Sequence, residues 1–206
     1  MKKAFPGGFH ADRFLLLVLI SCAGIGEQHA QAPAASANQP REMPAPALPY
    51  YDRGACPFEG CVYREWTARK TLVVYDTYEA RRKAIGRVSA GEKVAALTGV
   101  VITFRPGVVR MNRDLPEQGL RRGDTVLTYT YQGEGVSSVW VKGRFYPAMD
   151  LAFARGPGNT GCQGEACAGT FAERGRHAWW ARIRTKLGVT GWVVAEGNFD
   201  GQDLLA

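Results

Sequence analysis

The sequence predicts an all-β protein built of small barrels, in two tandem or partly duplicated units that follow a signal peptide and a disordered tether. Short β-branched and aromatic segments recur, and each ends at a Gly, Pro or Asn. Gly (25) and Pro (11) are abundant among the 206 residues, as in turn-rich β proteins. All five Trp and all eight Tyr follow residue 49. This pattern argues against a helical bundle, a polytopic membrane protein and a long coiled coil.

Residues 1–22 have the layout of a secretory signal, with two early lysines and an apolar run at 14–20. The run is too short for a spanning helix, which needs roughly 20 apolar residues. Residues 19–22 resemble a bacterial lipobox, which implies cleavage before Cys22 and a lipid anchor on that cysteine. Two other interpretations stay open: ordinary cleavage after the Ala-Gln-Ala of residues 30–32, and a buried segment of the fold.

Residues 23–49 predict an extended tether. They contain eight Ala and five Pro, and they show neither helical nor strand periodicity. A semi-rigid spacer of this kind would let a folded module stand away from a membrane anchor. Disordered filler without such a role is the alternative.

The cysteines support export to an oxidising compartment. Removal of Cys22 from the five leaves an even set in two close pairs, Cys56 with Cys61 and Cys162 with Cys167. Two local disulfides are the simplest connectivity, and counting alone leaves the two crossed pairings open. A structural zinc site is the disfavoured alternative, because 100 residues separate the pairs.

Strands are expected throughout the folded part, which we divide into a first β unit at 50–112 and a second at 113–206. Residues 76–86 predict a loop with a single helical turn, since Arg81, Arg82 and Lys83 leave little apolar face. An eight-residue pattern at 87–94 recurs at 119–126, which suggests a duplicated module. The expected strands are 71–75, 93–97, 100–104, 125–131, 139–141, 179–185 and 191–194.

Residues 84–94 resemble an early segment of bacterial SH3-like domains. Residues 179–185, followed by the Gly-Val-Thr-Gly-Trp-Val of 188–193, are similar to the closing hairpin of that family. The resemblance implies a small barrel of five or six strands without catalytic activity. It also implies an exported protein that binds cell-wall peptides or accompanies cell-wall enzymes.

The segment 179–184 alternates, so its side chains should divide between two faces of a strand. Trp179, Ala181 and Ile183 are expected in the core. The opposite set would place an indole beside two guanidinium groups on the solvent face, a typical anchor for recognition. In the alternative interpretation this indole packs under Phe199. The candidate ligand-binding residues are Trp180, Arg182 and Arg184, with Tyr129 and Tyr131 as neighbours; Trp192 is expected in the core.

Residues with catalytic chemistry are scarce, so we expect no enzyme, no metal and no cofactor. Only His177 among the three His falls in the folded part, and the remaining cysteines are expected to be paired. The Gly-rich segment 156–161 contains a Pro and opens no helix, which argues against a dinucleotide site. A Cys–His cell-wall hydrolase using His177 is the remote alternative.

The charge balance suggests weak attraction to anionic envelope material. The net charge is +7, and removal of residues 1–21 leaves 23 basic and 18 acidic residues, a charge of +5. Nucleic-acid binding would require a denser basic patch. We therefore expect a non-catalytic envelope module that binds a cell-wall peptide or a partner protein, and that meets a membrane only through Cys22. A structural subunit of an envelope complex is the alternative.

Overall fold

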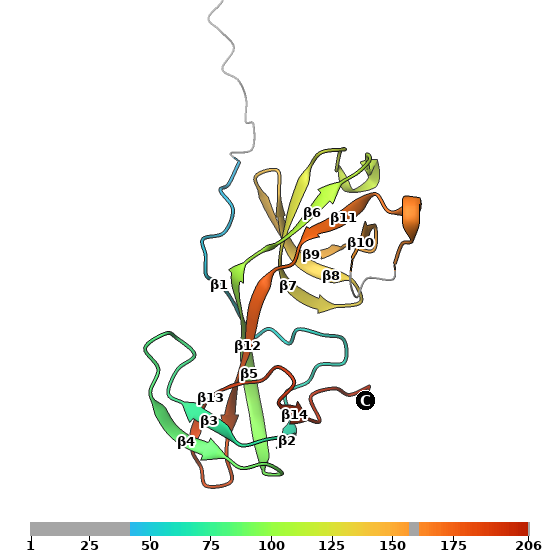
Figure 1. Ribbon diagram of the computed structural model, residues 1–206. Coiled ribbons are helices and arrows are strands. Elements are labelled where there is room, and N and C mark those ends of the chain that lie inside the picture. Colours follow the sequence, from blue (N-terminus) through green and yellow to red (C-terminus); the bar gives the residue numbers. More distant parts are fainter. Residues whose placement is uncertain (1–41, 157–160, 206) are drawn as a thin grey trace, which may run out of the picture. The chain divides into compact units, whose positions relative to one another are not determined.

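The structure is a computed structural model that describes residues 42–156 and 161–205 (Figure 1). Within these ranges the chain is nearly all β, as the sequence predicts, with two short 3-10 turns. The expected signal peptide, Cys22 and the tether up to residue 41 lie outside the described residues. None of the helices in the described ranges is long and apolar enough to cross a membrane.

The strands form two curled sheets. In the first sheet the order is β14-β2-β5-β12-β13-β3-β4, and β1 pairs with β5. In the second sheet the order is β10-β11-β6-β7-β8-β9. The strands are β1 (Tyr50–Arg53), β2 (Glu65–Ala68), β3 (Leu72–Tyr75), β4 (Ala84–Val88), β5 (Lys93–Arg105), β6 (Gly107–Met111), β7 (Thr125–Gly133), β8 (Val136–Val141), β9 (Arg144–Asp150), β10 (Ala154–Arg155), β11 (Gly169–Glu173), β12 (Arg176–Arg184), β13 (Thr190–Val194) and β14 (Phe199–Asp200); the 3-10 turns are η1 (Pro116–Gln118) and η2 (Gly164–Ala166).

One β module is inserted into the other. We call β1–β5 with β12–β14 the outer module, and β6–β11 the inserted module. The inserted module lies in the chain between β5 and β12, which pair antiparallel with each other along most of their length. The expected division into 50–112 and 113–206 is therefore corrected. The closing hairpin β12–β13 belongs to the first sheet, because β12 pairs with β5. It does not belong to the second sheet, which contains the strands that directly precede it in the sequence.

The two modules repeat one strand path. In the outer module β2, β5, β12 and β13 are successive neighbours, and β14 returns to pair with β2. In the inserted module β6, β7, β8 and β9 are successive neighbours, and β11 returns to pair with β6. The partly duplicated units expected from the sequence are present, but they are nested.

The recurring sequence pattern forms the same turn in both modules. In the outer module, the amide of Ser89 donates to Glu92 Oε2 at 3.0 Å and the amide of Glu92 donates back to the Ser89 carbonyl at 3.0 Å. The amide of Gly91, at φ +78°, donates to the carbonyl of Ala68 on β2, and the Ala68 amide donates to the Glu92 carbonyl. Glycine adopts this left-handed backbone without strain, so the turn leads directly into β5.

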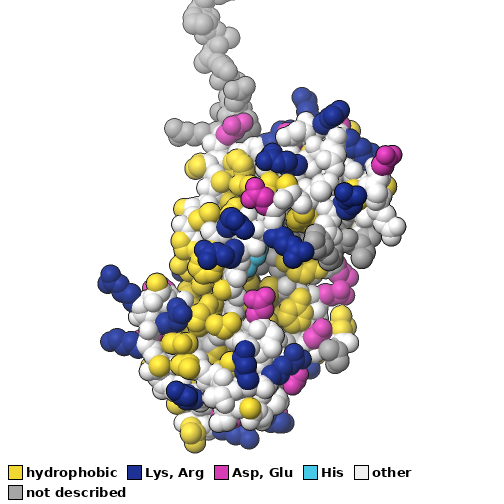
Figure 2. Space-filling view, viewed as in Figure 1, with side chains coloured by type: hydrophobic (Ala, Val, Ile, Leu, Met, Phe, Trp, Pro, Cys, Tyr) yellow, Lys and Arg dark blue, Asp and Glu magenta, His cyan; other side chains and the backbone are white. Residues whose placement is uncertain are grey.

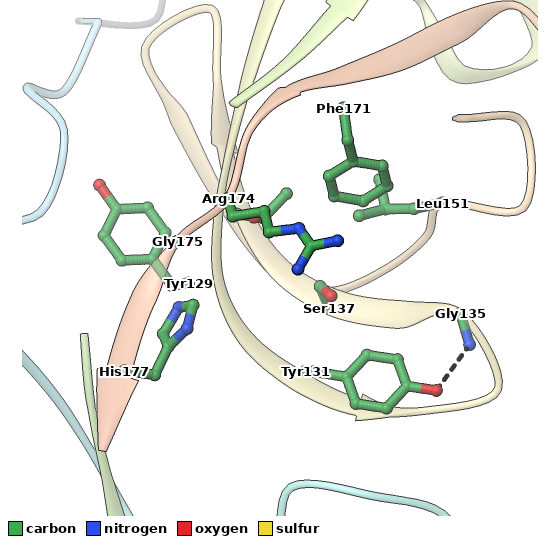
Figure 3. A pocket seen from close by; sticks show the side chains of 10 residues that line it. Tyr129, Tyr131, Gly135, Ser137, Leu151, Phe171, Arg174, Gly175 and His177 are labelled. Atoms are coloured by element: carbon green, nitrogen blue, oxygen red, sulfur yellow. Dashed lines mark hydrogen bonds between the residues drawn. The ribbon is translucent and has the colours of Figure 1, made fainter. Parts of the chain in front are cut away.

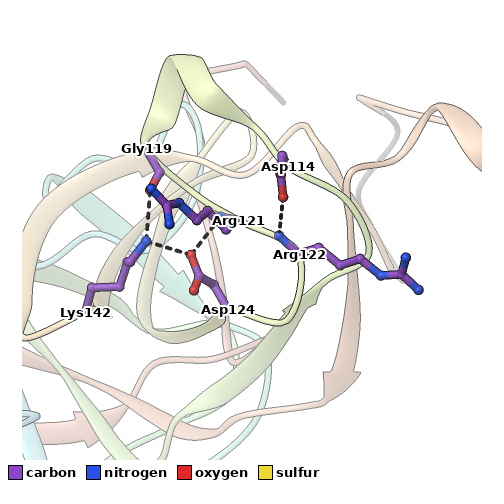
Figure 4. Close-up of polar contacts among 6 residues, drawn as sticks. All are labelled: Asp114, Gly119, Arg121, Arg122, Asp124 and Lys142. Atoms are coloured by element: carbon purple, nitrogen blue, oxygen red, sulfur yellow. Dashed lines mark hydrogen bonds and ion pairs between the residues drawn. The ribbon is translucent and has the colours of Figure 1, made fainter.

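The turn of the inserted module has the same four hydrogen bonds. Figure 4 shows the one that the Arg121 amide donates to the Asp124 carboxylate. Arg121 and Asp124 replace Ser89 and Glu92, Gly123 lies at φ +88°, and Met111 takes the place of Ala68. Asp124 also pairs with Lys142 Nζ at 3.0 Å. The Arg121 amide, and then the Lys142 ammonium, lower the pKa of Asp124, which keeps this turn carboxylate ionised.

Each module has its own core. Trp66 lies at the centre of the outer core, with ring centroids 5.7 Å from Trp179 and 5.4 Å from Phe199. The Trp66 indole donates to the carbonyl of Val62 at 2.9 Å, so its polar atom is satisfied on burial. The inserted core is aliphatic and is centred on buried residues that include Val109, Val126, Val139 and Leu151.

Both disulfides are local, as the spacing predicts. Cys56 pairs with Cys61 and Cys162 pairs with Cys167, with Cα–Cα distances of 5.5 and 5.2 Å. The backbone of Cys61 also forms an isolated antiparallel β-bridge with that of Asp203, so the first disulfide loop lies against the C-terminal segment of the outer module. The crossed connectivities and the zinc alternative are thereby excluded for these four cysteines.

The end of the expected tether is attached to the inserted module. Residues 42–49 have no regular secondary structure, in agreement with their composition. The amide of Met43, however, donates to the carbonyl of Gly143 at 2.8 Å, and the Trp140 indole donates to the Met43 carbonyl at 3.2 Å. The expectation of a free tether is thus corrected for its last residues, because the main-chain groups of Met43 form hydrogen bonds with Gly143 and Trp140.

Candidate functional site

The face that the sequence predicts for ligand binding is covered. Trp179, Ala181 and Ile183 do face the outer core, and Trp180 lies on the opposite face of β12, as the alternation predicts. Yet Trp180 is only 5% exposed. It packs with Val100 in a second cluster, which covers the other face of the sheet.

The covering comes from the β3–β4 hairpin. The guanidinium of Arg82 lies 4.9 Å from the centroid of the Trp180 ring and 5.1 Å from that of Tyr75. Tyr78 packs edge-on against Trp192, with centroids 4.6 Å apart. The expected exposed anchor at Trp180 is therefore corrected, because the segment 76–83 folds over it. The loop predicted at 76–86 is shorter than expected: it has no helical turn, and residues 84–86 belong to β4.

For the hairpin β12–β13, some of the remaining expectations are confirmed and others are wrong. Arg182 and Arg184 are exposed, as predicted. Trp192 is half-buried in the second cluster instead of the main core. Phe199 contacts Trp66 on the core side, so the alternative in which Trp180 packs under Phe199 is also corrected.

The two tyrosines of β7 have different environments. Tyr129 is 2% exposed and packs edge-on against Tyr50 and Phe145, with centroids 5.1 and 5.9 Å away. Burial, and then the proximity of Tyr50, raise the pKa of Tyr129, so its phenol stays neutral. Tyr131 is 46% exposed, and its hydroxyl accepts a 3.5 Å hydrogen bond from the amide of Gly135.

Two hollows share Tyr131 and His177, and we call them together the Tyr131–His177 groove. The first has a volume of about 340 Å³, and Figure 3 shows its side chains. The second has a volume of about 260 Å³ and is lined by Phe58, Trp179 and Glu196 among others. The first volume lies at the lower end of the range for ligand pockets, about 300–1,000 Å³, and the second lies below it. Trp180, Arg182 and Arg184 line neither hollow.

The position of His177 follows from an irregularity in β12. The register of β12 against β5 shifts between Arg176 and His177, and such a bulge redirects the side chains of the bulged strand. Gly175 precedes the shift, and a Cβ there would overlap the imidazole of His177, so glycine makes room for the ring. Thr103, which pairs with His177 across β5 and β12, donates from Oγ1 to the carbonyl of Tyr129 at 3.3 Å. This hydrogen bond holds β7 close to His177.

The groove combines aromatic walls with a few charged groups. Figure 2 shows hydrophobic side chains gathered around a hollow with a histidine at its edge. Desolvation by the surrounding walls lowers the pKa of His177, although a backbone hydrogen bond with Tyr129 and the charge of Glu196 oppose the shift. The imidazole is therefore mainly neutral at pH 7, and it offers one donor and one acceptor.

The groove is lined by aromatic rings, hydroxyls and isolated charged groups. Its walls supply rings from Phe171, Phe58 and Trp179. The four cysteines of the described ranges are held in disulfides, and no group of three or more His, Cys, Asp or Glu within those ranges is placed to hold a metal ion. Rings, hydroxyls and isolated charges can bind an extended ligand and fix its direction.

Of the candidate ligand-binding residues, Tyr129 and Tyr131 line the groove, but sequence reasoning missed most of its other residues. Phe58, Phe171, Arg174 and Glu196 come from four separate segments, and no local spacing connects them. From sequence alone, His177 suggests only a partner for a free cysteine. The available signal was the Arg-Gly-Arg-His run of 174–177, where a glycine interrupts a strand next to the only histidine of the folded part.

Comparison of the chain with protein-family models, with curated proteins and with solved structures finds no match.

Proposed function

We propose that this protein is a non-catalytic binding module of the cell envelope, which holds a cell-wall peptide in the Tyr131–His177 groove. The observation that carries the proposal is the groove itself, where aromatic side chains from both modules meet at Tyr131 and His177. An exposed tyrosine at such a junction is a typical recognition anchor, since it supplies apolar area and one polar atom at little entropic cost.

The compartment supports a cell-wall ligand. Two disulfides are expected of a chain that folds outside the reducing cytoplasm, and residues 1–22 resemble a secretory signal. The five-strand path repeated in both modules agrees with the small barrels that the SH3-like resemblance implies. Members of that family bind cell-wall peptides or accompany cell-wall enzymes.

The Cys–His hydrolase alternative lacks support. A thiolate nucleophile requires a free cysteine beside a base, and Cys56, Cys61, Cys162 and Cys167 are all in disulfides. Thiol titration of the unfolded mature protein tests this point: no reactive thiol is expected from these four, and a reactive thiol among them would revive the hydrolase.

Sedimentation with insoluble peptidoglycan tests the proposal. The wild type is expected to pellet, and Tyr131→Ala is expected to stay largely in the supernatant, because the shared wall of both hollows is lost. Leu97→Ala is the matched control: Leu97 is 42% exposed, close to the 46% of Tyr131, and lines neither hollow. Equal pelleting of Tyr131→Ala and Leu97→Ala would place the binding site elsewhere. Failure of the wild type to pellet would favour the partner-protein alternative.

The anchor is tested separately. The mass of the mature protein extracted from membranes should carry a diacyl or triacyl increment on Cys22 if the lipobox interpretation holds. A mass that corresponds to cleavage after residue 32, with no increment, would support a protein released in soluble form.

A further inference from the structure

The first hollow of the groove has a cation without a fixed partner. The guanidinium of Arg174 extends between Phe171 and Ser137 (Figure 3). Among the described residues it has no ion pair, and no carboxylate lines this hollow. Asp150, which lies beside Gly135, already accepts the amide of Ala152 at 2.7 Å. A guanidinium in a hollow without a carboxylate is suited to a planar carboxylate of a ligand.

The second hollow has the opposite charge. Glu196 is the only charged side chain that lines it, and it follows β13 in an exposed turn. Within the described ranges Glu196 has no ion pair. Phe58 and Trp179 also line this hollow, with ring centroids 5.7 Å apart at a near-perpendicular angle. A carboxylate and aromatic rings that line one hollow are suited to an ammonium group, which both can attract.

His177 and Tyr131 separate these charges. Both residues line both hollows, so a ligand that occupies the two hollows together must pass them. The imidazole of His177 is mainly neutral at neutral pH, because desolvation lowers its pKa. The groove therefore has a cationic end, a neutral aromatic centre and an anionic end.

We infer that the groove binds a short peptide with free ends in one direction, with its carboxylate at Arg174 and its ammonium at Glu196. The inference rests on the proposed function and goes further, because it assigns a ligand charge to each hollow. Short peptides with a free carboxylate at one end and a free ammonium group at the other are thus the expected class.

Three matched probes test the direction of binding. Trialanine with both ends free, trialanine amide and N-acetyl-trialanine differ only in which end is charged. They are titrated into ¹⁵N-labelled mature protein and followed by NMR shifts. The free peptide is expected to bind most tightly, and each blocked peptide about three- to tenfold more weakly, as befits a charge contact at a partly exposed site.

Charge-neutral variants assign each end. Arg174→Gln should weaken the free and acetylated peptides and leave the amide unchanged. Glu196→Gln should weaken the free peptide and the amide, and leave the acetylated peptide unchanged. Arg182→Gln, an exposed arginine of β12 outside the groove, should change none of them.

The outcomes separate this inference from the proposed function. If the three peptides bind equally and only Tyr131→Ala weakens them, the groove is the binding site and the assigned polarity is overturned. The assigned polarity would also be overturned if Arg174→Gln weakened the amide and left the acetylated peptide unchanged, while Glu196→Gln did the reverse. If no peptide binds while peptidoglycan still sediments the protein in a Tyr131-dependent manner, the free-ended peptide class is refuted and the proposed function stands.

Discussion

Replacement of Trp180 by alanine is expected to destabilise the outer module and not to remove a ligand contact. The side chain is 5% exposed, so the substitution leaves a cavity that costs about 3–5 kcal/mol of the free energy of unfolding. The edge-on contact with Tyr75, at 5.9 Å, contributes about 0.5–1.5 kcal/mol beyond buried area. The cation of Arg82 over the ring adds about 0.5–1 kcal/mol.

Urea unfolding of the purified mature protein, followed by circular dichroism, measures this loss. For a chain of this size the loss corresponds to a decrease in Tm of about 6–20 °C. Arg182→Ala, two residues along the same face of β12, should change the free energy of unfolding by less than about 0.5 kcal/mol, since Arg182 is exposed. The reasoning is refuted if Trp180→Ala unfolds at the wild-type urea midpoint but no longer sediments with peptidoglycan, because Trp180 would then be an exposed anchor.

Three other sets of substitutions test the turns, the groove and the disulfides. Gly91→Ala and Gly123→Ala should each cost about 1–2 kcal/mol of stability from backbone strain alone, since both have positive φ and open space at Cβ; wild-type urea midpoints would contradict the shared turn. The pKa of His177 is lowered, so from about pH 6.5 down to that pKa the unfolded chain binds more protons and stability falls as the pH falls. His177→Gln should flatten this part of a Tm-against-pH curve, and an unchanged slope would assign it to other groups. Cys56→Ser combined with Cys61→Ser opens a short loop and should lower the free energy of unfolding by about 2 kcal/mol, measured in urea without reductant; a loss within error of zero would contradict a stabilising bridge.

Features that depend on neighbours in sequence could be predicted. The period-2 alternation of 179–184 assigned Trp179 and Ile183 to the core, because successive side chains of a strand point to opposite faces. The Gly-acid turn was visible twice, since its carboxylate closes on an amide only three residues away. The local disulfides followed from spacing for the same reason.

Features that depend on distant pairing could not be predicted. The hairpin β12–β13 closes the outer module because β12 pairs with β5, across an insertion of about 70 residues, and no local pattern encodes that choice. Alternation separated the two faces of β12 but could not show that loop 76–83 covers one of them. The exposure of Trp180 was therefore mispredicted.

The sequence by itself determined an all-β chain with duplicated turns, two short disulfide loops and aromatic strands, because these depend on local backbone geometry and side-chain alternation. Only the tertiary structure decided that one module is inserted in the other and that a groove forms at Tyr131 and His177. The physical reason is that a groove is lined by side chains from strands and turns that are far apart in the chain. Their proximity is set by the packing of whole modules.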